Sequence, residues 1–394
     1  TLPHINNLEI VSQFQLYKPR PLNYYQHLVQ KYDIMAITGN KGEWSEIYTL
    51  FKLLGDGKVY AGDAMLNKMS IYYPIIDIIR QETSRFDYRP DDTKQIVFID
   101  QEGMQLLSIP MSRFANEAQS LLDVIVSAKG ASFAVPATER FMKSIGCNQL
   151  KAKSTDKADI HIVIHDLRTG MKPNLGFSIK SQLGSASTLL NAGATTNIIY
   201  LIKGVSLTDQ DISNINSIDD HLGRMKYLDE LGAILQFDKI DHDVFRNNLL
   251  FIDSSMPQFI ADCVSISSGC KGILPVADVV KCIAERNPFG FTGSNVEIFY
   301  AHKMKMLLLD VALGMTPAKE WTGQYDANGG YLVVRQDGEI VCYHFYNRND
   351  VEDYLYYNTR FERASRSRYN FGSLYRGNDG NVRIKLNLQI RFKK

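Results

Sequence analysis

Hydrophobic positions three or four residues apart predict helices along much of the chain. The clearest predicted helix covers residues 40–54, with Asn40 as its N-cap and two glycines, Gly55 and Gly57, at its end. Its apolar residues fall on one face, as expected for a helix that packs against a core. The other stretches with helical spacing are residues 64–81, 113–128 and most of 207–313, including Val296 to Leu313.

Alternating apolar and polar positions predict strands. Residues 158–165 alternate, and a turn-forming link leads directly to a second strand at 175–181, so these two are expected to pair antiparallel. The apolar run 197–202 is expected to be the next strand of the same sheet, and a short strand covers 95–100. Two further strands flank Asp337-Gly338, which is typical of a hairpin. The predicted fold is α/β, a mixed sheet flanked by helices.

The composition is that of a folded protein and excludes several classes. Of 394 residues, 45% are hydrophobic and 22% charged, which excludes a largely disordered chain. No apolar run is long enough to span a membrane, and the five cysteines form no C-x-x-C pair, so a cytoplasmic protein with reduced thiols is expected. The net charge of +1 excludes a uniformly basic, histone-like protein but leaves room for a local basic patch.

The chain divides into three predicted parts. Prolines at 19 and 21 interrupt residues 1–33, which are expected to form an N-terminal arm or a small helical addition. Residues 34–345 hold the predicted core. Residues 346–394 are expected to pack on that core as a basic segment, since residues 359–394 carry seven arginines and three lysines against two acidic residues.

The predicted strand pair carries candidate catalytic groups. Asp159 lies on the strand face opposite the isoleucines, and Ser178, Lys180 and Gln182 share one face of the second strand. If the strands pair, Asp159 and Lys180 can face the same cleft. A carboxylate can hold Mg²⁺, and a lysine can orient or deprotonate water and offset phosphate charge, which suits hydrolysis of a phosphodiester. The alternative is an exposed ion pair on an ordinary hairpin.

Two glutamates on the helix at 40–54 are candidates for a second metal ligand. Glu43 falls on the apolar face and Glu46 at its edge. A carboxylate on a core-facing stripe is unfavourable unless it is paired or binds a metal. The alternative is that both are solvated glutamates favoured by the helix dipole.

The basic segment is the candidate nucleic-acid surface. The planar guanidinium group of arginine binds phosphates and guanine edges. The alternative is a solvated loop whose charges pair with acidic protein surfaces. The candidates are Arg360, Arg363, Arg366, Arg368 and Arg376.

Several blocks match a known family in order along the chain. They are residues 40–46 (NKGEWSE), 151–154 (KAKS), 159–166 (DIHIVIHD), 176–185 (GFSIKSQLGS), 312–317 (ALGMTP), 329–334 (GGYLVV) and 385–392 (KLNLQIRF). From Ile37 to Phe392 the chain resembles the HpaII family of Type II restriction endonucleases.

The resemblance implies a PD-(D/E)xK nuclease core with helical insertions that cleaves double-stranded DNA with Mg²⁺. By that analogy Asp159 binds the metal, Lys180 is the catalytic lysine, and either Glu43 or Glu46 is the helix glutamate. Such sites usually carry an acid where this chain has Ser178. Either the helix glutamate replaces that acid, or the neighbouring Gln182 contributes a neutral ligand, or only one metal is held tightly.

The resemblance also implies CCGG as the default recognition sequence and a companion DNA methyltransferase. A homodimer is expected, because two-fold symmetry suits a palindrome. The alternatives are a structure-selective or non-specific repair nuclease on the same core, or a DNA-binding protein that has lost catalysis because an acid is missing. The residues expected to hold the DNA backbone near the scissile phosphate are Ser185, Thr188, Asn191 and Asn197.

Overall fold

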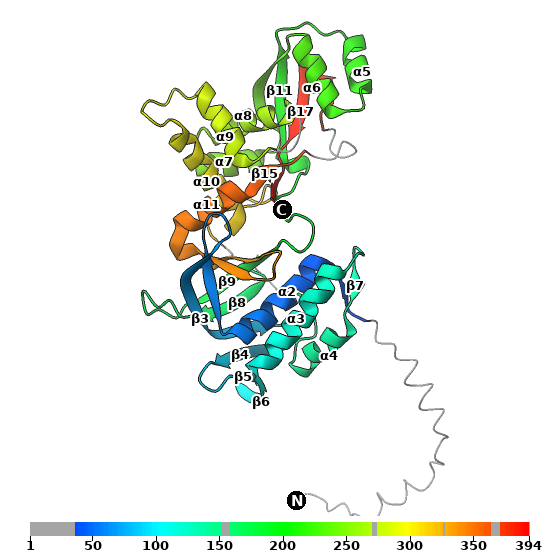
Figure 1. The fold of residues 1–394 in the computed structure, drawn as a ribbon. Helices are drawn as coiled ribbons and strands as arrows, with labels where there is room; N and C mark the ends of the chain where they lie inside the picture. Colours follow the sequence, from blue (N-terminus) through cyan, green and yellow to red (C-terminus); the bar gives the residue numbers. More distant parts are fainter. Residues whose placement is uncertain (1–35, 152–157, 270–273, 326–327, 364–370, 394) are drawn as a thin grey trace, which may run out of the picture.

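The computed structural model describes residues 36–151, 158–269, 274–325, 328–363 and 371–393. The predicted arm at 1–33 and two candidate arginines, Arg366 and Arg368, lie outside these residues. Helices combine with parallel and antiparallel strands, which confirms the predicted mixed class. Figure 1 shows two lobes, with the C-terminus where they meet.

A mixed nine-stranded sheet builds the lower lobe of Figure 1, in the order β2-β14-β13-β9-β8-β3-β4-β5-β6. β13 runs parallel to β9, and β14 runs parallel to β2. The other neighbours pair antiparallel, including β8 with β9 as predicted. The strands are β2 (Lys58–Gly62), β3 (Lys68–Gln81), β4 (Arg85–Asp91), β5 (Ile96–Gln101), β6 (Met104–Pro110), β8 (Ile160–Ile164), β9 (Asn174–Ser181), β13 (Gly330–Val334) and β14 (Ile340–His344).

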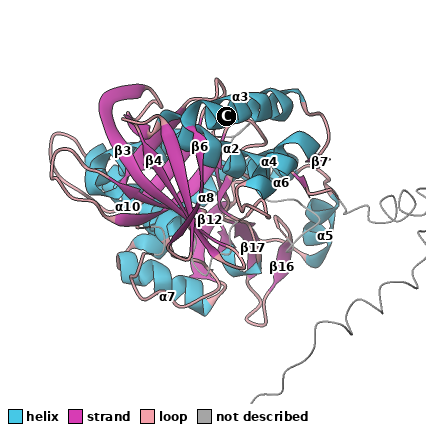
Figure 2. Cartoon of the chain, turned by 90° about the horizontal axis from the view of Figure 1, so that it is seen from below, coloured by secondary structure: helices cyan, strands magenta, loops and turns pink. Residues whose placement is uncertain are grey.

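Helices cover one face of this sheet (Figure 2). The first begins where Asn40 accepts a hydrogen bond from the Glu43 amide, and the Glu43 carboxylate accepts one from the Asn40 amide in return. It ends at Gly57, whose φ of 65° is left-handed. These signals confirm the helix predicted at 40–54, and the helix predicted at 113–128 is also present. The helices are α2 (Lys41–Asp56), α3 (Met111–Ser127) and α4 (Pro136–Ser144).

Strands β13 and β14 separate two hydrophobic cores. Leu332 and Val334 belong to the core of the helices α2 and α3, which we call the sheet core. Tyr331 and Val333 belong to the second core, which includes residues of α10 (Glu297–Leu313) and α11 (Arg348–Asn358) and which we call the helical core. This alternation follows from the two-residue period of a strand. The hairpin predicted around Asp337-Gly338 is confirmed.

The upper lobe combines helices with two small sheets, ordered β12-β11-β17-β16 and β10-β18-β15. Its strands are β10 (Thr188–Leu190), β11 (Asn197–Lys203), β12 (Ile234–Ile240), β15 (Thr359–Phe361), β16 (Leu374–Arg376), β17 (Val382–Asn387) and β18 (Ile390–Phe392). Its other helices are α5 (Asp209–Ser217), α6 (His221–Glu230), α7 (Asp243–Ile252), α8 (Met256–Gly269) and α9 (Val276–Arg286).

Two sequence predictions need correction. Residues 64–81 do not form a helix, because β3 occupies Lys68–Gln81 and pairs with β2, β4 and β8. Isoleucine, tyrosine and the central Pro74 all favour a strand over a helix there. The strand predicted at 197–202 is present, but it pairs with β12 and β17 and not with the large sheet. Residues 207–313 are mostly helical, as predicted, with the strand β12 among the helices.

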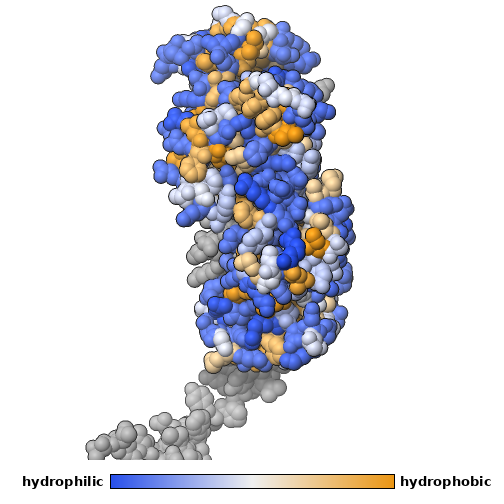
Figure 3. All heavy atoms as spheres, turned by 90° about the vertical axis from the view of Figure 1, so that its left-hand side faces the viewer, coloured by the Kyte–Doolittle hydropathy of each residue, from blue (hydrophilic) through white to orange (hydrophobic). Residues whose placement is uncertain are grey.

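Within the described part of the chain, no single helix has the length and apolarity needed to cross a membrane. Helices α7 and α8 meet that test only as a pair, with a bend of 108° between them. Hydrophilic side chains cover most of the face drawn in Figure 3, and hydrophobic ones lie among them in separate groups.

Candidate active site

The antiparallel pair β8–β9 positions Asp159, the residue just before β8. Its amide donates to the carbonyl of Phe177 at 2.8 Å, which continues the strand ladder. Its Oδ2 atom accepts hydrogen bonds from the Ile179 amide at 2.7 Å and from the Ser178 hydroxyl at 3.0 Å. The carboxylate is therefore held against β9 in one orientation, as the strand pattern predicted.

Ser178 links the two candidate catalytic groups. Lys180 Nζ donates to Ser178 Oγ at 3.0 Å, and the same hydroxyl donates to Asp159. Ser178 is 6% exposed, so water competes little for these bonds. Asp159 and Lys180 do come together, as predicted, and the serine found in place of an acid joins them.

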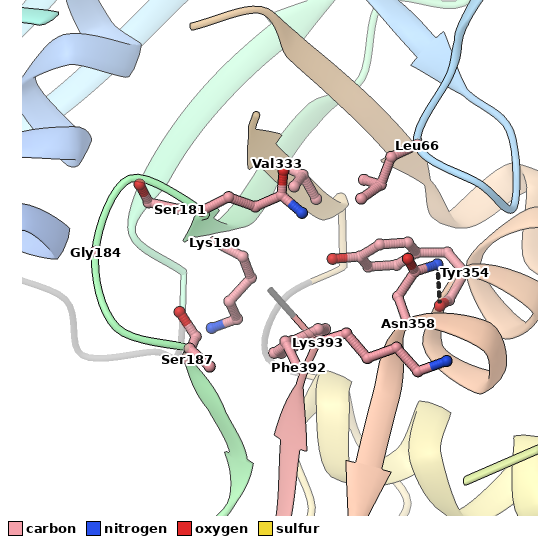
Figure 4. Close-up of a pocket in the computed structure, with 12 residues that line it drawn as sticks. Leu66, Lys180, Ser181, Gly184, Ser187, Val333, Tyr354, Asn358, Phe392 and Lys393 are labelled. Atoms are coloured by element: carbon pink, nitrogen blue, oxygen red, sulfur yellow. Dashed lines mark hydrogen bonds between the residues drawn. The ribbon is translucent and has the colours of Figure 1, made fainter. Parts of the chain in front are cut away.

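Lys180 points out of the sheet toward the helical core. In the parallel β9–β13 pair, Lys180 lies opposite Val333, and its Nζ atom is 5.3 Å from the centre of the Tyr331 ring. Figure 4 shows its side chain reaching toward Ser187. Burial lowers the pKa of Lys180, and the negative charges of Asp159 and Glu46 oppose that change.

The two helix glutamates have different surroundings. Burial raises the pKa of Glu46 to about 8, and the charge of Asp159 adds to the rise, whereas Lys151 and Arg80 oppose it. Glu43 instead caps the helix through the Asn40 amide at 2.9 Å and lies 3.5 Å from Lys151 Nζ. Of the two, Glu46 is the one brought into electrostatic contact with both Asp159 and Lys180.

The donor set fits a hard divalent cation bound by few protein ligands. In the residues that the structure describes, no group of three or more His, Cys, Asp or Glu side chains could hold a metal. Burial raises the pKa of Glu46 to about 8, the negative charge of Asp159 adds to the rise, and a cation would favour the ionised form of both carboxylates. Mg²⁺ commonly uses one or two carboxylates and completes its shell with water and phosphate oxygens. The two carboxylates match this preference.

The segment that follows β9 leads away from Lys180 toward the upper lobe. The backbone amide of Gln182 donates to the Val334 carbonyl at 2.9 Å, and Gln182 lines the same pocket as Lys180. Ser185 is exposed, and Thr188 pairs with Arg391 between β10 and β18.

Of the two asparagines predicted to contact the DNA backbone, one is exposed and one is buried. Asn191 is exposed. Asn197 is 3% exposed and accepts a hydrogen bond from Asn387 Nδ2 at 2.7 Å. Its burial argues against the predicted contact of Asn197 with DNA.

Acidic residues neutralise much of the described basic segment. Arg376 donates to Asp209 at 2.7 Å and to two carbonyl oxygens, so each nitrogen of its guanidinium group has a partner within the protein. Arg360 pairs with Glu362 at 3.1 Å. Arg363 lies just after β15 and also has a partner. The alternative considered for this segment, pairing with acidic surfaces, therefore describes Arg360 and Arg376 better than base recognition does.

Sequence reasoning missed two groups beside the site. Arg80 and Glu82 form a buried ion pair at 2.7 Å, and the charge of Arg80 acts on Glu46. Because residues 64–81 were predicted to form a helix, this pair was not recognised. Tyr331 lies beside Lys180 and donates its hydroxyl to the Ala312 carbonyl at 3.0 Å. The strand predicted just before Asp337-Gly338 was the signal that could have placed it.

Comparison with known proteins agrees with the sequence blocks. The model of the HpaII restriction endonuclease family matches residues 40–392. The chain is also 44% identical over 357 residues to the Type II restriction enzyme HpaII of Haemophilus parainfluenzae, covering 90% of this chain and 98% of that enzyme. The chain belongs to the HpaII restriction endonuclease family. This confirms the resemblance, and the protein is accordingly a Type II restriction endonuclease, which cleaves DNA at specific sequences.

Members of the HpaII family act on double-stranded DNA, and the site lies in the part of the chain that the family model covers. Family membership sets the repair-nuclease alternative aside. No solved structure matches the chain. The roles of individual residues in this family member therefore rest on the geometry described above.

Proposed function

We propose that this protein hydrolyses phosphodiester bonds in double-stranded DNA with Mg²⁺, on a PD-(D/E)xK core formed by α2, β8 and β9. The observation that carries the proposal is the hydrogen-bonded chain from Lys180 through Ser178 to Asp159. Glu46, on the neighbouring helix, provides the second carboxylate. The recognition sequence proposed is CCGG, by analogy with the family.

Asp159 and Glu46 would hold the metal. When bound, Mg²⁺ supplies positive charge opposite the phosphate and makes a nearby water molecule more acidic. Asp159 keeps its orientation through the amide of Ile179 and the hydroxyl of Ser178. In such cores an acidic residue on the strand usually supplies the second negative charge. In this protein Glu46 on α2 would supply it instead, and Ser178 acts as a positioning residue.

Lys180 would act on the attacking water. Because burial lowers its pKa, its amine gives up a proton more easily than an exposed lysine does and can then accept one from water. In its charged form it also stabilises the negative charge that develops on the phosphate. The hydrogen bond to Ser178 holds Nζ on the Asp159 side of the cleft.

A homodimer would place two such sites on the two strands of a palindrome. A companion methyltransferase would protect the host's own sites.

The test is digestion of unmethylated DNA with Mg²⁺ or with EDTA, followed by mapping of the ends. Discrete Mg²⁺-dependent fragments with ends at CCGG are expected. Lys180→Ala should lower the cleavage rate by about 10² to 10⁴-fold while DNA binding remains. Lys172→Ala is the matched control, because Lys172 is exposed just before the start of β9, whereas Lys180 lies near its end. Cleavage by Lys180→Ala at the wild-type rate would contradict the proposed site.

A further inference from the structure

Two hollows meet at the loop that follows β9. The first lies beside Lys180 and extends to Asn358 and Lys393 (Figure 4). The second encloses about 640 Å³ between the start of α2, the segment after α3 and the same loop. Both hollows are lined by Ser181, Gly184 and Ser187. The same loop therefore borders both hollows, and we call the two hollows together the lysine groove.

The lysine groove is lined by cations without acidic residues. Its charged lining residues are Lys180 and Lys393 in the first hollow and Lys41 and Lys129 in the second, and neither hollow is lined by Asp or Glu. The hollow beside α10 and α11 differs, because Glu297 and Glu352 line it together with Lys305. Positive charge is thus concentrated in the lysine groove, although the whole chain carries only +1.

The charge of Lys41 and Lys129 is available to a ligand. Lys129 is exposed, and the described residues provide no ion-pair partner for Lys129 or Lys41. Among the described residues, the ammonium group of Lys41 makes a single hydrogen bond, to the Val126 carbonyl at 3.2 Å. The basic C-terminal strands differ, because Arg383 pairs with Asp238 and Lys385 with Asp241. An incoming anion would meet unneutralised charge in the lysine groove and neutralised charge on those strands.

Small residues leave room for a polymer backbone along this path. Gly42, Gly130 and Ser185 are among the residues that line the second hollow. At Gly184 an added Cβ would lie 3.2 Å from the Cβ of Lys41, so this glycine lets the loop approach α2 closely. The groove therefore combines small lining residues with positive charge, and both features suit a sugar-phosphate chain.

We propose that the lysine groove binds the phosphates that flank the scissile phosphate on one DNA strand. The strand would run from Lys180 past Ser185 to Lys41 and Lys129. This inference rests on the proposed function, which places the scissile phosphate at Lys180. It assigns the sequence-independent contacts to the start of α2 and the segment after α3, and not to the C-terminal arginines.

The test is the salt dependence of binding to a duplex that contains CCGG and to one in which that site is scrambled, both in EDTA. For the double variant Lys41→Ala, Lys129→Ala we expect the slope of log K against log salt to become shallower by about 0.9 for each lost phosphate contact. Both duplexes should be affected equally, because phosphate contacts carry no sequence information. Lys172→Ala should keep the wild-type slope, and Lys41→Arg, Lys129→Arg should restore most of it.

The outcomes separate this inference from the nuclease proposal. A wild-type slope in the double alanine variant would overturn the lysine groove, and so would an equal loss of slope in Lys172→Ala. A loss that the arginine variant does not repair would indicate a fault in folding and would also overturn it. If the wild-type protein cuts no DNA while the slope changes as expected, the groove stands and the proposed catalytic function fails.

Discussion

Glu46 is a carboxylic acid placed so that it holds a proton near neutral pH. Burial is the main cause, and the neighbouring charge of Asp159 adds to it, which together raise its pKa to about 8. A metal ion held by Glu46, as proposed above, would stabilise the ionised form, so its binding would displace this proton. Under that proposal, proton release and metal binding are coupled at a single residue.

This coupling predicts the pH dependence of metal binding. Below pH 8 the proton competes with the metal, so affinity should rise by up to about tenfold per pH unit until about pH 8 and then level off. Calorimetric titration with Mg²⁺ in two buffers of different ionisation enthalpy would count the released proton. Glu46→Gln should bind the metal more weakly and release no proton from this site. Equal proton release by the variant would assign the proton to another group.

The same residue predicts how stability depends on pH without metal. The folded pKa of about 8 lies above the ordinary value of 4.5, so unfolding releases a proton between these two pH values. The contribution of Glu46 to stability is thus full below pH 4.5 and is lost as pH rises toward 8. In EDTA, Glu46→Gln should remove this part of the decline.

Individual residues of the site could be predicted to different degrees. Asp159, Ser178 and Lys180 follow from strand alternation and from pairing through a short turn, both of which are local. Choosing between Glu43 and Glu46 required the position of α2 against β9, which no local pattern contains. The partners of Arg376 could not be predicted either, because Asp209 lies 167 residues away along the chain.

At the scale of the elements, the spacing of β8 and β9 depends on Gly176. An added Cβ there would lie 2.7 Å from the Cβ of Ala158, the residue before Asp159. This distance is too short for two carbon atoms, so β8 would have to move. The position of Asp159 therefore depends on the missing side chain of Gly176.

Gly176→Ala should impair catalysis by moving Asp159. We expect a fall in single-turnover cleavage of about 10²-fold, since catalytic groups displaced by about 1 Å lose about that much, with DNA binding retained. Gly269→Ala is the control, because no heavy atom of the described residues lies within 4 Å of its added Cβ and its φ is not positive. A Gly176→Ala variant with the wild-type cleavage rate would show that the strands tolerate a wider spacing.

Elements with strong local signals were predictable, and those defined by distant partners were not. The capping box at Asn40 and the Asp-Gly hairpin turn act within a few residues, and both elements are where they were expected. β3 was misread because 14 residues with several isoleucines fit a buried helix as well as a long strand. Its three partner strands, one of which begins at residue 160, decide between the two.

At the scale of the whole molecule, the two hydrophobic cores share strands. Leu332 belongs to the sheet core, and the neighbouring Val333 belongs to the helical core. If β13 left its place, apolar residues of both cores would become exposed to solvent. The predicted boundary at residue 345 stays a prediction, since these shared strands lie directly before it.

The shared strands predict that the described lobes unfold together. Leu332→Ala in the sheet core and Leu308→Ala in the helical core, both fully buried, should each cost about 2 to 5 kcal/mol. Each should shift one common calorimetric transition to lower temperature. Two separated transitions, with each variant shifting only one of them, would instead identify two independent folding units.

The assignment of strands to separate sheets also belongs to this scale. Residues 197–203 are apolar and follow β9 closely, which made them appear to continue the same sheet. Their actual partner β17 lies at Val382–Asn387, far along the chain. Pairings over such sequence distances leave no trace in a local pattern.

The residues of the proposed active site and of the lysine groove come from almost the whole described length of the chain. They range from Lys41 and Glu46 on α2 to Lys393 after β18. The amide of Phe392 also bonds to the Ser187 carbonyl at 2.9 Å, which joins the last strand to the loop beside Lys180. A nascent chain still lacking β18, or a fragment left by proteolysis, would therefore carry Asp159 and Lys180 without a finished binding surface.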